Sequence, residues 1–451
     1  MARWLLAISG GVLLYFGSGL QPVWWLAWLA PAPVLLAMLQ SSRRQAVAVA
    51  LLAAVIGSAN LWSYLAMLAG PLLASILTLE QSLLWAGAWI FSAHVMVHTA
   101  GWRAALVYPA AITALFTLMT QASPHGSAGS IAYSQMDVLP VIQIASLLGA
   151  SGVVFVISLL PATLAAGLHH RKACLWPLVL LAAALVFGWV RLRTAPLSPA
   201  ARVAAVAVDT APEPREDVWP LYQAGVRELA EQGARFIVLP EKIAPVDAAQ
   251  WRAVENTLAS SAVTVAGATL RAQGQKRNVA SVFGAPDTPT YDKRHMVPGL
   301  EDSFLRGDKP LILEHGGIRF GVAICKDMDF PSLGRDYAGV PLLLVPAWDF
   351  QRDAWLHSRM AILRSVESGF AMVRSARDGR LTVNDRYGRV LAEQESSASR
   401  PAKLIADVPL DNARTFYSRT GDWFGQCCFL LMMAIAVTLR PSRSGSRQKG
   451  S

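Results

Sequence analysis

The segment 318–327, IRFGVAICKD, is a short apolar, strand-like run that stops abruptly at Cys325. Around it, across residues 201–411, short β-branched runs alternate with amphipathic stretches. This alternation predicts an α/β layered domain. The expected strands are 202–208, 235–239, 262–268, 279–283, 311–314, 318–324 and 341–346. From residue 371 onward we expect three more strands, separated by turns at Asp378-Gly379 and Tyr387-Gly388. The expected helices are 215–233, 246–260 and 353–368.

Three of these segments end at side chains that can carry chemistry. Glu241 follows the run 235–239, Cys325 follows the run 318–324, and Lys293 lies in a polar cluster between them. Catalytic groups often lie where a buried strand meets a loop, because the strand fixes the backbone and the loop exposes the side chain. We therefore expect Glu241, Lys293 and Cys325 to meet in one site.

A carboxylate, an ammonium group and a thiol form a workable set for acyl transfer. Glu241 could remove the proton of Cys325. Lys293 could lower the pKa of the thiol and face the oxygen that turns negative in a tetrahedral intermediate. The backbone N–H of Lys326 would be a second donor to that oxygen if the chain bends sharply after Cys325.

The rest of the chain is apolar, since 54% of the 451 residues are hydrophobic and only 16% are charged. Soluble domains average about 25% charged residues, so we expect a polytopic membrane protein. A formal charge of +10 would indicate a nucleic-acid partner in a soluble chain, but in a membrane protein it is more often loop charge, and no nucleic acid is expected. The candidate spans are 4–20, 23–40, 46–68, 71–97, 104–120, 138–167, 174–190 and 423–439.

The loop charges predict an orientation. With the N-terminus inside, the cytoplasmic stretches hold the positive charges Arg3, Arg43, Arg44, Arg103, Arg171, Lys172, Arg440, Arg443, Arg447 and Lys449. The opposite short loops contain neither Lys nor Arg, as the positive-inside rule requires. The expected organisation is a membrane domain of seven spans (1–192), an extracytoplasmic catalytic domain (201–411), an eighth span (423–439) and a cytoplasmic tail (440–451).

The candidate site residues resemble the signatures of a known superfamily. Pro240-Glu241, the segment 293–298 (KRHMVP) and Ile324-Cys325 are similar to the three signatures of the nitrilase, or carbon–nitrogen hydrolase, superfamily. The resemblance implies an αββα sandwich with Glu241, Lys293 and Cys325 as its triad. It also implies that Glu301 is a second acidic helper.

The whole chain resembles the bacterial apolipoprotein N-acyltransferase family, because a domain of this kind is set between seven spans and one span. The segment 133–135 (YSQ) is similar to a Gly-Tyr-Ser-Gln segment of that family, and 415–423 (TFYSRTGDW) is similar to its domain-exit motif. The resemblance implies substrate-binding roles for Tyr133, Gln135 and Trp348, with Lys326 supporting the triad.

Several residues depart from that family pattern. A tryptophan is usual at Leu239, a small polar residue at Lys242, Phe-Gly at Gly299-Leu300, and an aromatic residue and a glutamate at Lys326 and Asp327. These departures change the pocket wall and the charge beside the sulfur, so the substrate is less determined than the reaction type.

Other interpretations remain open. His295 and His357 permit a Cys–His pair, while the eight dispersed histidines do not indicate a metal site, and no GxxxxGK[ST] loop is present, so we expect neither a metal nor a cofactor. Arg364 and Glu367 are most simply a solvated helix face, with bracing of the site as the alternative.

The leading hypothesis is an acyltransferase of the bacterial inner membrane with its catalytic domain on the periplasmic side. It would move an acyl chain from a phospholipid, through a thioester on Cys325, to the N-terminal amine of a lipid-modified cysteine on a lipoprotein. The alternatives are a membrane-anchored amidase-like hydrolase and a paralogue that binds lipid or lipoprotein without catalysis.

Overall fold

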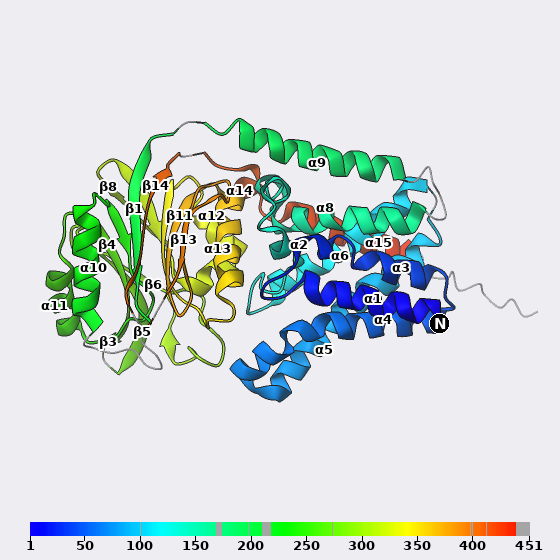
Figure 1. The fold of residues 1–451 in the computed structure, drawn as a ribbon, viewed down its shortest axis with the longest axis horizontal. Coiled ribbons are helices and arrows are strands. Elements are labelled where there is room, and N and C mark those ends of the chain that lie inside the picture. The colour runs from blue at the N-terminus through cyan, green and yellow to red at the C-terminus, as the bar shows by residue number, and fades with distance from the viewer. Residues whose placement is uncertain are drawn as a thin grey trace, which may run out of the picture.

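The structure is a computed structural model that describes residues 1–99, 101–167, 174–196, 198–209, 218–272, 274–396, 398, 400–411 and 413–438. The expected tail 440–451 and the loop charges Arg171 and Lys172 lie outside the described residues. The chain forms a bundle of apolar helices that lies beside a two-sheet sandwich (Figure 1).

The helical part comprises α1 (Ala2–Gly17), α2 (Trp24–Ala27), α3 (Pro31–Leu39), α4 (Arg43–Ser58), α5 (Trp62–Met96), α6 (Ala104–Ala122), α7 (Leu139–Ile142), α8 (Ala145–Gly167), α9 (Leu175–Arg193) and α15 (Trp423–Thr438). Among the described residues, four helical segments are long and apolar enough to cross a membrane: Arg43–Met96, Gly101–Ala122, Ala145–Gly167 and Leu175–Arg193. Ala2–Gly17, Trp24–Leu39 and Trp423–Thr438 are shorter apolar helices. The protein is therefore a membrane protein.

The helix boundaries differ from the expected spans 46–68 and 71–97. Helix α4 ends at Ser58, and α5 starts at Trp62. Helix α5 is broken at Gly70, which has a φ of 82° and is followed by Pro71. Proline cannot continue the hydrogen-bond ladder of a helix, and φ above zero is available to glycine at little cost. The intervening 59–69 segment leaves the bundle and reaches the sandwich, where Ser63 Oγ accepts a hydrogen bond from Arg352 at 3.1 Å.

The sandwich consists of two sheets. The first has the order β14-β1-β2-β4-β5-β6, formed by β14 (Ala402–Pro409), β1 (Ala200–Ala207), β2 (Phe236–Val238), β4 (Val263–Ala272), β5 (Gln275–Phe283) and β6 (Thr290–Asp292), with β3 (Pro245–Val246) beside β4 and β7 (Phe304–Leu305) beside β5. The second has the order β13-β12-β11-β10-β9-β8, formed by β13 (Val390–Glu395), β12 (Arg380–Asn384), β11 (Ala371–Arg377), β10 (Leu342–Trp348), β9 (Ile318–Val322) and β8 (Leu311–His315). The central strands are parallel in both sheets: β1, β2 and β4 in one and β9, β10 and β11 in the other.

Helices cover both outer faces, so the layers are α-β-β-α (Figure 1). One face carries α10 (Trp219–Glu231) and α11 (Ala248–Leu258), and the other carries α12 (Pro331–Asp336) and α13 (Ala354–Ser368). The predicted fold class, an αββα sandwich joined to a helical membrane domain, is confirmed. Strand β14, which pairs antiparallel with β1, was not predicted.

The layer of α13 lies against the membrane helices (Figure 1). Met360, Leu363 and Val366 of α13 belong to the same buried apolar cluster as Val153 and Ile157 of α8. A shared core of this kind resists relative motion of the two parts. The sandwich is therefore held at a fixed position relative to the helices.

Candidate active site

Glu241 is fixed where two backbones approach closely after β2. The Pro240 carbonyl accepts a hydrogen bond from the Gly267 N–H at 3.0 Å. A Cβ at residue 267 would lie 2.5 Å from the Pro240 oxygen and 2.6 Å from the Glu241 Cα, so this approach requires glycine. The Glu241 N–H donates to Ala347 O of the second sheet at 3.1 Å. Both sheets thus hold the carboxylate in place.

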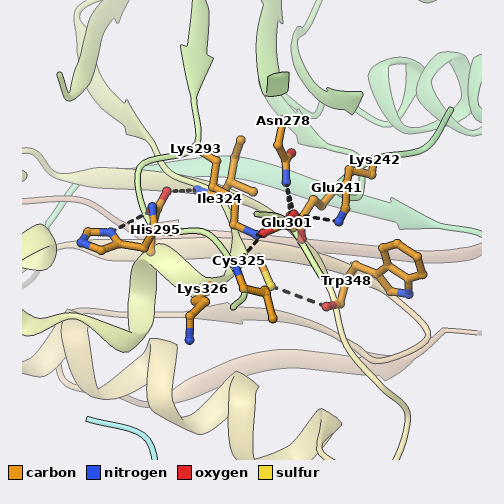
Figure 2. A network of polar contacts seen from close by, with 12 residues as sticks. Glu241, Lys242, Asn278, Lys293, His295, Glu301, Ile324, Cys325, Lys326 and Trp348 are labelled. Atoms are coloured by element: carbon orange, nitrogen blue, oxygen red, sulfur yellow. Dashed lines mark hydrogen bonds and ion pairs between the residues drawn. The ribbon is translucent and has the colours of Figure 1, made fainter. Parts of the chain in front are cut away.

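Lys293 follows β6, and its ammonium group lies between two buried carboxylates (Figure 2). The Nζ atom donates to Glu241 Oε1 at 2.8 Å and to Glu301 Oε2 at 2.7 Å. Asn278 Nδ2 bridges the same carboxylates, at 2.6 Å and 2.8 Å, and Lys242 Nζ donates to Glu301 Oε1 at 2.7 Å. Two carboxylates face two ammonium groups, so the buried charges are paired and hydrogen-bonded, as burial requires.

Cys325 lies beneath this cluster (Figure 2) and has a left-handed backbone, with φ of 42°. It begins a 3-10 turn, η6 (Cys325–Asp329), which is separated from the end of β9 by two residues. The sulfur lies 3.5 Å from the Trp348 carbonyl oxygen at the end of β10. The chain therefore bends sharply after Cys325. Such a bend was the condition under which the Lys326 N–H could donate to the oxyanion.

Asp327 ties this turn to the segment that carries Lys293. Its carboxylate accepts hydrogen bonds from the backbone N–H groups of Ile324 (3.0 Å), His295 (2.9 Å) and Arg294 (3.3 Å) and from the Tyr291 hydroxyl (2.8 Å). The side chain is completely buried. Cys325 and the lysine segment are therefore connected through one carboxylate. From the sequence, Asp327 was noted only as a departure from the family pattern, so this role was not predicted.

The surroundings fix the protonation states. Burial alone would lower the pKa of Lys293, but Glu241, Cys325 and Glu301 outweigh it, so the pKa is raised and the lysine stays cationic. Burial, and then the charge of Glu241, raise the pKa of Cys325 well above its ordinary value, against the opposing effects of Lys293 and Arg374. Lys293 thus lowers the pKa of the thiol, as expected, but burial and Glu241 raise it by more. The resting sulfur is a thiol that needs a base.

A second charged cluster lies on the other side of the sulfur. Arg374 forms a bidentate pair with Asp349, with Nη1–Oδ2 at 3.0 Å and Nη2–Oδ1 at 2.5 Å, and both side chains are buried. His357 Nδ1 lies 3.2 Å from Asp353 Oδ2. Burial would lower the pKa of His357, but Asp353 and Asp349 outweigh it and raise the pKa to about 9. Neither Asp349 nor Arg374 was singled out from the sequence, although Arg374 follows the apolar start of β11.

A cavity of about 560 Å³ joins the sulfur to the membrane helices. Its walls include Glu241, Lys293 and Cys325 together with Glu80 of α5. Most of the lining is apolar and comes from the 59–69 segment, the membrane helices and α13: Leu61, Leu65, Leu68, Leu77, Met119 and Leu356. Tyr64 of the 59–69 segment hydrogen-bonds Asp353, so this segment forms part of the cavity wall.

The other predicted residues lie in different places. Trp348 lines the cavity, and so does Lys326, whose ammonium is 3.4 Å from Asp329 Oδ2 and 3.3 Å from His125 Nδ1. Tyr133 and Gln135 are buried between the helices and the sandwich and are not part of this cavity wall, so their role in substrate binding stays a prediction.

The two histidines of the alternative Cys–His interpretation are each paired with aspartate. His295 Nδ1 lies 3.0 Å from Asp327 Oδ1, and His357 pairs with Asp353. Among the side chains that the structure describes, no group of three or more His, Cys, Asp or Glu is arranged to hold a metal ion.

Arg364 and Glu367 do not form the solvated face that was the simpler interpretation. Both are completely buried, with Arg364 Nε 3.1 Å from Glu367 Oε2. Glu367 Oε1 accepts a hydrogen bond from the Ala150 N–H of α8 at 2.7 Å. The membrane helices cover this side of α13, which is why its charged residues are enclosed.

Two buried side chains, a carboxylate and an ammonium group, and a half-buried thiol lie at the strand ends of an αββα sandwich that is joined to a bundle of apolar helices. This arrangement is similar to the one expected for a membrane-bound protein of the nitrilase class. Residues 10–163 match the family model of the apolipoprotein N-acyltransferase N-terminal domain. Over these residues the chain is similar to the apolipoprotein N-acyltransferases.

The similarity to individual relatives extends over nearly the whole chain. The apolipoprotein N-acyltransferase of Geobacter metallireducens is 25% identical, over 94% of this chain and 93% of its own. That of Gloeobacter violaceus is 26% identical, over 93% and 91%. Among solved structures, an amidase of the nitrilase superfamily from Nesterenkonia AN1 is 20% identical, covers 52% of this chain and 98% of its own, and gives a TM-score of 0.43.

Proposed function

We propose that this protein is an N-acyltransferase that moves an acyl chain from a membrane phospholipid to the N-terminal amine of a lipid-modified cysteine on lipoproteins. The observation that carries the proposal is the cavity, because it connects the half-buried thiol of Cys325 with apolar walls supplied by membrane helices. A long acyl chain fits such walls, whereas a small polar amide has no need of them.

In the first half-reaction Glu241 accepts the thiol proton as the sulfur of Cys325 attacks the ester carbonyl carbon. Lys293 and the Lys326 N–H stabilise the oxygen that becomes negative. The ester C–O bond then breaks, and the departing lysophospholipid alkoxide takes the proton back from Glu241. The acyl chain remains as a thioester on Cys325. Glu301, Lys242 and Asn278 hold the carboxylate and ammonium groups in place throughout.

In the second half-reaction the lipoprotein amine attacks the thioester carbonyl carbon. The amine loses a proton to Glu241, the C–S bond breaks, and the sulfur recovers a proton from Glu241. Both substrates are anchored in the membrane, so a site fixed at the membrane surface raises their effective concentration. The proposed location is the bacterial inner membrane, with eight spans, the sandwich on the periplasmic side and both termini in the cytoplasm.

The test is mass spectrometry of the full-length protein after incubation with phospholipid vesicles. An acyl group on Cys325 that leaves when a lipid-modified peptide is added is the expected result. Cys325→Ala should abolish it, whereas Cys427→Ala, which removes an exposed thiol of α15, should not. Ammonia release from small amides without an acyl thioester would instead support an amidase-like hydrolase, and no modification with an unreactive thiol would support a non-catalytic lipid-binding protein.

A further inference from the structure

The backbone at the nucleophile is held in a costly conformation. A non-glycine residue in the left-handed region costs on the order of 1–3 kcal/mol and persists only where its surroundings hold it. Asp327 secures the first part of η6 from within the sandwich. The last residue of the turn, Asp329, is held from another direction.

The membrane part supplies that contact. Ser127, in the loop between α6 and the 3-10 turn η3 (Ile131–Gln135), donates twice to the Asp329 carbonyl, from its N–H at 2.9 Å and from its Oγ at 2.6 Å. The neighbouring Gly126 has φ of 56°, and a Cβ there would lie 2.5 Å from the same carbonyl oxygen. The loop is therefore pressed against the end of the catalytic turn.

Ser127 is one member of a buried hydrogen-bond chain. Its Oγ lies 2.5 Å from the Tyr133 hydroxyl, which in turn lies 3.3 Å from Arg364 Nη2. A guanidinium can only donate, and Ser127 donates to Asp329 O, so Tyr133 donates to Ser127. The chain therefore runs in one direction, from Arg364 through Tyr133 and Ser127 to the Asp329 carbonyl.

This chain crosses between the two parts of the protein twice. Arg364 belongs to α13 and Asp329 to η6, both in the sandwich, whereas Tyr133 and Ser127 belong to the membrane part. All three side-chain donors are at most 1% exposed. Hydrogen bonds linked in series in a low-dielectric interior reinforce one another. Two membrane residues are thus inserted between a helix of the sandwich and its catalytic turn.

We propose that Ser127 and Tyr133 are positioning residues for Cys325, so that the membrane part completes the catalytic turn of the sandwich. By holding Asp329, they keep η6 in the conformation that presents the sulfur and the Lys326 N–H. The inference takes Cys325 as the nucleophile, as the proposed function does, but it does not depend on the identity of the acyl donor or acceptor.

The test uses the full-length protein in detergent and a small soluble thiol reagent. Ser127→Ala removes the Oγ contact and leaves the backbone N–H in place. The rate at which iodoacetamide alkylates Cys325 is followed from pH 6 to 11 by peptide mass spectrometry, since the pKa of this thiol is raised. We expect a rate about fivefold lower, as for the loss of one hydrogen bond, and a midpoint of the pH profile shifted by about half a unit or more.

Two further variants make the result specific. Ser130→Ala is the matched control, because Ser130 lies in the same loop and its hydroxyl accepts a hydrogen bond from the Ala132 N–H at the start of η3. The substitution keeps the backbone of Ser130 and should leave rate and midpoint unchanged. Tyr133→Phe removes the donor to Ser127 but keeps the ring, and it should change both quantities in the same direction as Ser127→Ala, but less.

A purely structural role would lower the unfolding temperature without moving the midpoint of the pH profile. Equal profiles for Ser127→Ala, Tyr133→Phe and Ser130→Ala would overturn the inference. Because alkylation requires no lipid, a positive result would survive even if the unsubstituted protein formed no acyl thioester. That outcome would refute the proposed function alone.

Discussion

Replacement of Asp327 by asparagine tests how the catalytic turn is held. The two carboxylate oxygens accept from the N–H groups of Ile324, Arg294 and His295 and from the Tyr291 hydroxyl. Asparagine keeps the shape but has one oxygen, and its amide group would face two or more of these donors. Each buried donor left without an acceptor costs about 1–3 kcal/mol. The free energy of unfolding should therefore fall by about 2–6 kcal/mol.

The effect on activity is worked out from one contact, the hydrogen bond from the Ile324 N–H to Asp327, because Ile324 is the residue before Cys325. If the loss of one such bond is felt in the transition state, thioester formation slows about 5- to 150-fold. The assay is transfer of a labelled acyl chain from phospholipid vesicles to Cys325, with thermal unfolding of the same samples in detergent.

The matched control is Asp336→Asn. Asp336 forms an exposed pair with Arg294, with Oδ2 2.6 Å from Nη1 and 40% of its side chain exposed. Exposed pairs contribute about 1 kcal/mol or less, so rate and unfolding temperature should stay close to those of the unsubstituted protein. Equal behaviour of Asp327→Asn and Asp336→Asn would refute the claim that Asp327 anchors the turn.

Three other substitutions have defined outcomes. Lys242→Met removes one of the cations that keep the pKa of Glu301 low. The acid limb of the pH–rate profile of thioester formation should therefore move to higher pH. An unmoved limb would show that Lys293 alone keeps the pKa of Glu301 low. His357 has its pKa raised from 6.5 to about 9, so its contribution to stability, up to about 3 kcal/mol, is complete below pH 6.5 and lost as pH rises through 9. The unfolding temperature of His357→Gln should accordingly change less between pH 6 and 10 than that of the unsubstituted protein, and parallel curves would contradict this. Gly267→Ala forces the Glu241 backbone away and should reduce thioester formation about tenfold or more if even 1.4 kcal/mol of alignment is lost, whereas an unchanged rate would show that the site tolerates the shift.

The sequence was sufficient for the layered fold because its signals are local. Apolar runs such as 318–324 and 341–346 mark the buried central strands, and Asp247 caps α11 with hydrogen bonds to the Ala249 and Gln250 N–H groups. Strand β14 escaped prediction because its two charged residues, Lys403 and Asp407, do not alternate with the apolar residues as they would in a typical half-buried strand. Only pairing with β1, about 200 residues earlier in the chain, makes it a strand.

The site shows the same division between local and long-range information. Glu241, Lys293 and Cys325 each follow an apolar run or lie in a polar cluster, so they could be selected individually. Asn278 could not be selected, because its role is to bridge two carboxylates supplied by segments about 20 and 40 residues away. Similarly, a pair such as Arg364 and Glu367 resembles a solvated helix face until the membrane helices are placed against it.

The shared apolar cluster of α13 and α8 has a practical consequence for anyone who isolates the sandwich. Cutting the chain before β1 and after β14 would release a fragment whose Met360, Leu363 and Val366 had lost their cover. Such a fragment would expose an apolar patch to water and tend to self-associate. Its thiol chemistry would then differ from that of the full-length protein even with Glu241, Lys293 and Cys325 unchanged.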